Sequence, residues 1–254
     1  MFGLRLRLRV LLEYTVIYGA KFVKKRIIVA LDFDTPSKAL NFLDHLDPDL
    51  CRVKIGKELF TAGGPDLVSS VVNKNFDVFL DLKFHDIPNT VAGAVRVASE
   101  LGVWMLNVHI AGGSAMMRAA KEALSRSRGQ PPILIGVTVL TSLSKEDLFE
   151  VGVNNDLAEH VMNLASLAHN SGLDVVVCSA DEAKLLRASL SKDFKLITPG
   201  IRRAQDSTGD QKRVVSPSEA IQNGSDFLVV GRPITRAVSP RDALVEFNSE
   251  IEIL

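Results

Sequence analysis

Eight short apolar runs follow one another along the chain after Lys25, and each is nearly continuous rather than alternating between apolar and polar residues. The runs are RIIVALDF (26–33), CRVKIG (51–56), FDVFLDLK (76–83), VWMLNVHI (103–110), ILIGVTVL (133–140), DVVVCS (174–179), FKLITPG (194–200) and DFLVVGR (226–232). Continuous apolar runs rich in β-branched residues are typical of strands that are covered on both faces. We therefore predict eight buried strands.

Longer amphipathic or alanine-rich segments separate these runs and predict helices. The segment 35–46 has Thr35 as a possible N-cap and Pro36 at the first helical position. The segment 89–102 has its apolar residues spaced for one helical face and ends at Gly102. The same reasoning predicts helices within 114–127, 155–172, 180–190 and 216–224.

The strand–helix unit repeats about eight times in roughly 225 residues, which is the arithmetic of a closed (β/α)₈ barrel. A doubly wound open sheet is the alternative, but it usually has fewer strands and a glycine-rich turn after the first strand. The first run continues as ALDFDTPS and has no such turn. No linker rich in Pro, Gly or Ser divides the repeats. We predict an α/β fold, a single-domain (β/α)₈ TIM barrel over residues 26–254.

The first 25 residues, MFGLRLRLRVLLEYTVIYGAKFVKK, differ from the rest of the chain. Basic residues followed by an apolar run resemble a signal peptide, but Glu13 interrupts the run and no small-residue cleavage site precedes Lys24 and Lys25. The segment is also too short and too charged to span a bilayer. The alternation in LRLRLRV permits an edge strand. We interpret residues 1–25 as an N-terminal extension of unknown role.

Composition excludes few functions, but the net charge and the cysteines bear on the expected partners and cellular compartment. The chain has 30 Lys and Arg against 30 Asp and Glu, so its formal net charge is zero. Global electrostatics therefore gives no reason to expect nucleic acid or a membrane surface as a partner. Cys51 and Cys178 both lie in or beside apolar runs, which predicts two buried thiols rather than a disulfide. This pattern suits a reducing cytoplasm.

Polar residues gather where the predicted strands end. Active-site groups of a TIM barrel lie at the carboxyl ends of its strands. The ends of the runs carry Asp32, Lys54, Asp81, Lys83, His109, Thr141, Ser179, Pro199, Gly200, Gly231 and Arg232. The beginnings of the runs carry no comparable set, so the sequence predicts an active site at this rim.

Asp81 and Lys83 form the centre of the predicted site. They are two residues apart, so a regular strand places both side chains on the same side. With Lys54 and Asp32 on neighbouring strands they make a mixed-charge cluster whose titrations are coupled. A purely structural ion network is the alternative. Buried ion pairs are poor stabilisers because desolvation is costly, and this favours a function.

The last two loops of the barrel favour a phosphate. The segment TPGIRRAQDSTGDQKR (198–213) follows the seventh strand, and VVGRPIT (229–235) places Gly231 and Arg232 before a helix. Loops seven and eight of TIM barrels commonly bind phosphate through backbone N–H groups and a helix N-terminus. Arg232 would add charge-assisted hydrogen bonds. The cations Arg202, Arg203, Lys212 and Arg213 cannot all contact one ligand, so some of them belong to a solvated lid surface.

Six motifs in order resemble one family. DLKFHDIPNT, with ALDF and KIGKELF before it and TVLTS, TPGIR and VVGRPIT after it, resembles the orotidine 5'-phosphate decarboxylases of bacterial pyrimidine biosynthesis. The resemblance runs from about Arg26 to the end of the chain. It implies a carboxy-lyase that converts orotidine 5'-monophosphate to UMP without cofactor or metal. Related barrels share the Asp-x-Lys-x-x-Asp core, so a metal-dependent sugar-phosphate decarboxylase or synthase remains the alternative.

The resemblance also implies a role for each charged residue of the cluster. Lys83 would stabilise and protonate the C6 carbanion, and Asp81 would lie against the substrate carboxylate. Lys54 and Asp32 would complete the network and hold the ribose hydroxyls.

The resemblance further implies a homodimer with shared active sites, in which Asp86 and Thr90 reach into the partner subunit's site. The remaining substrate contacts that it implies are Thr141 near the base, and Arg202, Gln211, Gly231 and Arg232 at the phosphate and lid. His85 and His109 suggest metal or acid–base chemistry, but we predict that neither is catalytic. His85 would point away from the site if the strand continued regularly.

Overall fold

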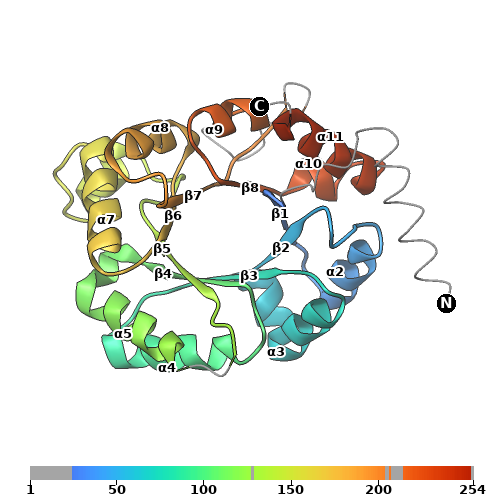
Figure 1. Ribbon diagram of the computed structural model, residues 1–254, viewed down its shortest axis with the longest axis horizontal. Helices are drawn as coiled ribbons and strands as arrows, with labels where there is room; N and C mark the ends of the chain where they lie inside the picture. The colour runs from blue at the N-terminus through green and yellow to red at the C-terminus, as the bar shows by residue number, and fades with distance from the viewer. Residues whose placement is uncertain (1–24, 127–128, 204–205, 207–213, 253–254) are drawn as a thin grey trace.

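Eight parallel strands close into a barrel in the computed structural model, and helices surround the ring (Figure 1). The structure describes residues 25–126, 129–203, 206 and 214–252. Each strand pairs with the next, and β8 pairs with β1. The strands are β1 (Ile27–Ala30), β2 (Arg52–Gly56), β3 (Val78–Phe84), β4 (Met105–His109), β5 (Ile133–Val137), β6 (Val175–Val177), β7 (Lys195–Thr198) and β8 (Phe227–Val230). The predicted fold and all eight predicted strands are confirmed, and each strand is shorter than its apolar run.

The predicted helices are confirmed as well, and the connection after β2 is a helix of its own. The helices are α2 (Pro36–Leu43), α3 (Lys57–Asn73), α4 (Pro88–Ser99), the 3₁₀ turn η1 (Ile110–Gly112), α5 (Gly113–Ser125), α6 (Lys145–Glu150), α7 (Leu157–Asn170), α8 (Ala180–Ser189), α9 (Pro217–Gln222), α10 (Arg232–Thr235) and α11 (Pro240–Glu252). Thr35 occupies the N-cap position of α2 with Pro36 in the first turn, although its side chain makes no capping hydrogen bond. None of the helices in the described ranges has the length and apolar character needed to cross a membrane.

The apolar runs are nearly continuous because most of the strands are buried on both faces. In β1, Ile28 and Ala30 belong to the cluster inside the barrel, whereas Ile27 and Val29 belong to the larger cluster between the barrel and the helices. Alternate residues of a strand point to opposite faces, so a barrel wrapped by helices needs apolar residues at both. The site is therefore built on strands that are packed on both faces.

Strand β2 departs from this rule at its inward positions. Val53 and Ile55 are fully buried toward the helices, while Arg52 and Lys54 alternate with them. The Arg52 guanidinium lies 4.1 Å from the centre of the Trp104 ring, beside the interior cluster. Lys54 lies at the other end of the same face, among the residues of the cavity described below.

The predictions for the two cysteines and for the N-terminal extension have different outcomes. Cys51 and Cys178 are buried and free, as predicted, and burial raises the pKa of both thiols above the usual range. The N-terminal extension lies outside the described residues apart from Lys25, whose ammonium is 3.6 Å from the Asp77 carboxylate.

Candidate active site

A cavity of about 780 Å³ opens at the carboxyl ends of the strands. Its floor is apolar and comes from the barrel interior, including Phe79, Val137 and Ile197. Its predicted polar lining is present: Asp32, Lys54, Asp81, Lys83, Thr141, Pro199, Gly200, Arg202, Gly231 and Arg232. Most of the rim predicted from the ends of the apolar runs therefore lines one cavity, whereas His109 and Ser179 do not line it.

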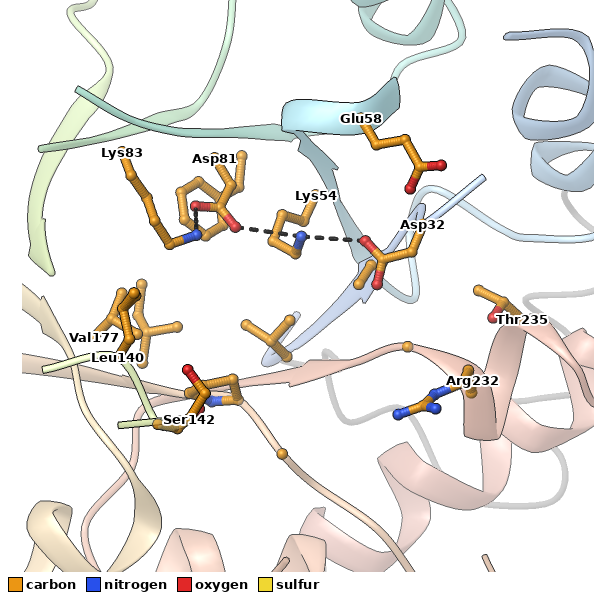
Figure 2. Close-up of a pocket in the computed structure, with 18 of the residues that line it drawn as sticks. Asp32, Lys54, Glu58, Asp81, Lys83, Leu140, Ser142, Val177, Arg232 and Thr235 are labelled. Carbon is orange, nitrogen blue, oxygen red and sulfur yellow. Dashed lines mark hydrogen bonds and ion pairs between the residues drawn. The ribbon is translucent and has the colours of Figure 1, made fainter. Parts of the chain in front are cut away.

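Four charged side chains form a row of alternating sign along one wall of the cavity (Figure 2). The Lys54 ammonium lies 3.5 Å from an oxygen of Asp32 and 3.3 Å from Oδ2 of Asp81. Lys83 Nζ donates to Oδ1 of the same Asp81 carboxylate over 2.6 Å. The row is built from β1 to β3 because neighbouring parallel strands end at the same rim.

Asp81 and Lys54 are the buried members of the row. The side chains are 11% and 12% exposed, against 65% for Asp32. Burial alone would raise the pKa of Asp81, but the charges of Lys54 and Lys83 and two hydrogen bonds outweigh it and lower the pKa. Burial would lower the pKa of Lys54, but Asp81 and Asp32 raise it above its usual value. Both groups are therefore charged at neutral pH.

Lys83 reaches the row through an irregular backbone. Leu80 pairs with Leu106 and Phe84 pairs with Val108, so β3 advances four residues while β4 advances two. Lys83 lies in this bulge with a φ of 53°, a left-handed conformation that non-glycine residues seldom adopt. The prediction that Asp81 and Lys83 share a side is confirmed, but the proposed cause, a regular strand, is wrong.

Asn107 belongs to the site and was missed in the sequence. It lies on β4, lines the cavity and is 1% exposed. Its Nδ2 donates to Oδ1 of Asp81 over 2.6 Å, and its Oδ1 accepts the backbone N–H of Lys83 over 2.7 Å. The available signal was a polar residue inside an apolar run, two residues before His109, at the position that faces the barrel interior.

Asp86 and Thr90 do not line this cavity. Both are exposed, Asp86 just beyond β3 and Thr90 in the first turn of α4. An oxygen of Asp86 accepts the N–H of Ile87 over 2.6 Å, and the Ile87 side chain is 67% exposed. Their crossing into a partner's site stays a prediction.

The two arginines after β7 point to different places. Arg202 is buried, lines the cavity and donates to the carbonyl of Ile201 over 2.7 Å. The Arg203 guanidinium instead lies 4.6 Å from the centre of the Phe247 ring and pairs with Asp206 and Glu246. Arg203 therefore fixes the loop to α11. Gln211, Lys212 and Arg213 lie outside the described residues.

Three other polar residues near the rim, Ser179, His85 and His109, lie outside the charged row. Ser179 forms a capping box with Glu182 at the start of α8. The His85 and His109 rings are 5.6 Å apart, outside the charged row. Burial, with the charges of His85 and Lys83, lowers the pKa of His109 to about 4, so its imidazole is neutral at pH 7. Within the described ranges, no group of three or more His, Cys, Asp and Glu side chains is placed to hold a metal ion.

A TIM barrel with an alternating carboxylate–ammonium row at its mouth has the architecture of a barrel enzyme with its active site at the strand ends. The chain belongs to the Orotidine 5'-phosphate decarboxylase / HUMPS family, whose model matches residues 25–247. It is 56% identical to an orotidine 5'-phosphate decarboxylase of Shewanella sediminis over 90% of this chain and 98% of that one. The orotidine 5'-phosphate decarboxylase of Vibrio vulnificus is 54% identical over 90% of this chain and 99% of that one.

A solved structure supports the same placement. The crystal structure of orotidine 5'-phosphate decarboxylase from Lactobacillus acidophilus has a TM-score of 0.81 and 38% identity, covering 90% of this chain and 99% of that one. The family resemblance carried by the six motifs is confirmed.

Asp81→Asn tests the electrostatics of the row. We expect it to lower the free energy of unfolding at pH 7 by about 3 kcal/mol, because Lys54 and Lys83 lose a buried counter-charge. The folded pKa of Asp81 is below its unfolded value of about 3.9, so this contribution is complete above pH ~4 and is lost as the pH falls through the folded pKa. The difference from wild type should therefore shrink in acid.

Urea unfolding at equal protein concentration and several pH values measures this difference. Asp44→Asn is the matched control, because Asp44 pairs with Lys74 at 2.7 Å but is 66% exposed. We expect the control to change stability by less than about 1 kcal/mol. Equal costs for the two variants would contradict the assignment.

Proposed function

We propose that the chain is a carboxy-lyase that converts orotidine 5'-monophosphate to UMP and CO₂ in de novo pyrimidine biosynthesis. The observation that carries the proposal is the Lys83 ammonium, held 2.6 Å from the Asp81 carboxylate at the mouth of the cavity. The names of the curated relatives support the same substrate.

The reaction needs direct stabilisation of charge. When the bond from C6 to the carboxylate breaks, the electron pair stays on C6 in an sp² orbital with no adjacent π sink. Many enzymes use a cofactor as an electron sink for such carbanions. We assign C6 a position beside the Lys83 ammonium, so that the positive charge stabilises the developing negative charge and a proton then moves from Nζ to C6. Lys83 is thus both the electrostatic stabiliser and the acid, and no cofactor or metal takes part.

Asp81 contributes less than Lys83. A substrate carboxylate about 4 Å from Asp81 would be repelled by about 4 kcal/mol at an effective dielectric constant near 20. Full relief of that repulsion would accelerate the reaction about a thousandfold. This value is an upper bound, because Lys54 and Lys83 already contact both oxygens of Asp81. The larger role of Asp81 is to hold the two ammonium groups in position.

The other end of the substrate binds away from the reacting centre. Arg232 lies across the cavity from the charged row, near Thr235, in Figure 2. We assign the phosphate to Gly231, Arg232 and Arg202 on loops seven and eight, the base to Thr141, and the ribose hydroxyls to Asp32 and Lys54. Binding energy gained at the phosphate can then position C6 against Lys83.

The alternative function, a metal-dependent sugar-phosphate decarboxylase or synthase, would need a divalent metal on Asp81. Both oxygens of Asp81 are in contact with ammonium groups, one on Lys54 and one on Lys83. A metal ion there would lie beside two positive charges. The donor set therefore favours the metal-free reaction.

Lys83→Ala tests the proposed chemistry. Purified wild-type protein should consume orotidylate, measured by its loss of absorbance, and the rate should be unaffected by EDTA. The variant should lose at least about 10³-fold in kcat, because it lacks both the stabilising charge and the proton. Lys74→Ala, on an exposed ion pair, is the control and should keep wild-type turnover. An inactive wild type, a fully active Lys83→Ala variant or collapse of activity on chelation would overturn the proposal.

Arg232→Ala tests the phosphate assignment. Removing a charge-assisted hydrogen bond should lower kcat/KM about 10–100-fold, mostly through KM. Arg203→Ala is the matched control, since Arg203 contacts Asp206 and Phe247. This control should unfold at a lower urea concentration than the wild type but keep its kcat/KM within about twofold of the wild-type value. Steady-state kinetics at constant ionic strength gives both values, and an equal loss in the two variants would rule the assignment out.

The shared site is proposed from the surface around Asp86. Asp86 and Thr90 are exposed, and the same segment carries two exposed apolar side chains, Ile87 and Val97, which are 67% and 51% exposed. All four lie on α4 or on the turn that leads into it. An exposed apolar patch rimmed by polar residues is typical of a protein–protein interface. We propose that this surface brings Asp86 and Thr90 to the partner's Lys83 in a homodimer.

Subunit mixing tests the shared site. Lys83→Ala and Asp86→Ala homodimers should each be nearly inactive. An equimolar mixture that exchanges subunits forms about half heterodimers, each with one of two sites intact, so about a quarter of the wild-type activity should return. Turnover measured before and after exchange, with size-exclusion chromatography of both states, checks this expectation. Absence of recovery after demonstrated exchange would show that Asp86 acts within its own subunit or not at all.

A further inference from the structure

We infer that Asn107 is a positioning residue: its carboxamide holds the Asp81 carboxylate and the Lys83 backbone in the geometry that the reaction needs. The inference rests on the proposed function and assigns part of the same site. Asn107 neither belongs to the charged row nor carries a charge, so it does not itself supply the chemistry.

The first observation is a gap in strand pairing. Leu80 pairs with Leu106 and Phe84 with Val108, so the backbone of Asp81, Leu82 and Lys83 stands opposite Asn107 alone. A bulge interrupts the regular ladder of backbone hydrogen bonds. The Asn107 side chain fills the gap, because its Oδ1 accepts the N–H of Lys83 over 2.7 Å. It thereby satisfies a partly buried donor at the residue with the left-handed backbone.

The second observation is that the other end of the same carboxamide binds Asp81. Asn107 Nδ2 donates to Oδ1 over 2.6 Å, the oxygen that also accepts from Lys83 Nζ over 2.6 Å. Lys54 contacts Oδ2 at 3.3 Å. The carboxylate is thus held at both oxygens and from three strands, which leaves it little freedom to rotate.

The chemistry of these two contacts requires an amide. A carboxamide presents one acceptor and one donor side by side, whereas a carboxylate only accepts and an aliphatic side chain does neither. The orientation of the amide is fixed, because a flipped group would place its oxygen against the Asp81 carboxylate. Asn107 is also 1% exposed, so water cannot readily replace these contacts.

The charges around Asp81 explain why a neutral donor suits this position. Lys54 faces it from β2 and Lys83 from β3, Asp32 lies beyond Lys54, and the neutral imidazole of His109 follows on β4. The amide stabilises the carboxylate without adding a third cation that would compete for it. Removing the amide donor should raise the pKa of Asp81, because a hydrogen bond to its charged form is lost.

The test compares Asn107→Ala and Asn107→Asp with Asn248→Asp in the full-length protein. Asn248 is the matched control, since it is 0% exposed and donates to the carbonyl of Leu50 over 3.1 Å but does not line the cavity. Turnover of orotidylate is measured against pH and normalised to the folded fraction from near-ultraviolet circular dichroism.

Both Asn107 variants should lose about 10–100-fold in kcat while KM changes by less than about threefold, the pattern of a misplaced reacting group. The acidic limb of kcat/KM should move to higher pH, and further in Asn107→Asp, because two adjacent carboxylates cannot both ionise readily. Asn248→Asp should lose stability but keep the wild-type kcat and pH profile. Asn107→Ser should recover part of the activity that Asn107→Ala loses.

The outcomes separate this inference from the proposed function. An inactive wild-type protein overturns the proposed function. With an active wild type, Asn107 variants that keep more than half of kcat and an unchanged pH profile overturn the inference alone. So does an Asn248→Asp variant with the same loss of kcat, because the effect would then be general. If Asn107→Ala does not fold, the nearly isosteric Asn107→Asp decides.

Discussion

The Asp81 carboxylate, held between the ammonium groups of Lys54 and Lys83, is the interaction on which the rest of the site depends. Removing a carboxylate from water is costly, and attraction to its partners offsets that cost only when the geometry is good and every lone pair is used. Here the two ammonium groups and the amide of Asn107 occupy both oxygens. The arrangement is therefore a way to fix two positive charges at defined points of the cavity, and only secondarily a source of stability.

The barrel tolerates this buried charge because its stability comes from apolar packing. Apolar side chains fill the barrel interior and the layer between strands and helices, with residues such as Phe79 and Leu106 almost completely buried. On the inward faces of β2 and β3, charge lies at the two ends of the interior: Arg52 beside Trp104 at one end, and Lys54 and Asp81 at the other end, where the cavity begins. The same alternation that builds the core thus delivers Lys54 and Asp81 to the rim without placing charge in the middle of the barrel.

The sequence predicted the eight strands and the charged rim well because both depend on local patterns: apolar runs, and polar residues at their ends. The reason predicted for the placement of Lys83, a regular strand, was wrong. A bulge depends on how two strands pair, so it leaves no periodic pattern in the sequence of either strand. Asn107 was missed for a related reason. Its role depends on lying opposite Lys83 in β4, and an asparagine within an apolar run carries no such information. The exposure of Asp86 likewise could not be predicted without the folded structure.

The irregular backbone at Lys83 belongs to the same set of contacts as the Asp81 carboxylate. In a regular strand, Asp81 and Lys83 would alternate with Leu82 and point into the barrel about two residues' rise apart, roughly 6.5–7 Å along the strand. In the structure the strand bulges between Leu80 and Phe84, and the Lys83 ammonium lies 2.6 Å from an oxygen of Asp81. A left-handed residue is unfavourable on its own and persists only where its surroundings hold it. The backbone of Lys83, the carboxamide of Asn107 and the carboxylate of Asp81 are therefore linked by hydrogen bonds into one structural unit, and we expect a change in any of them to move the ammonium to which we assign the reaction.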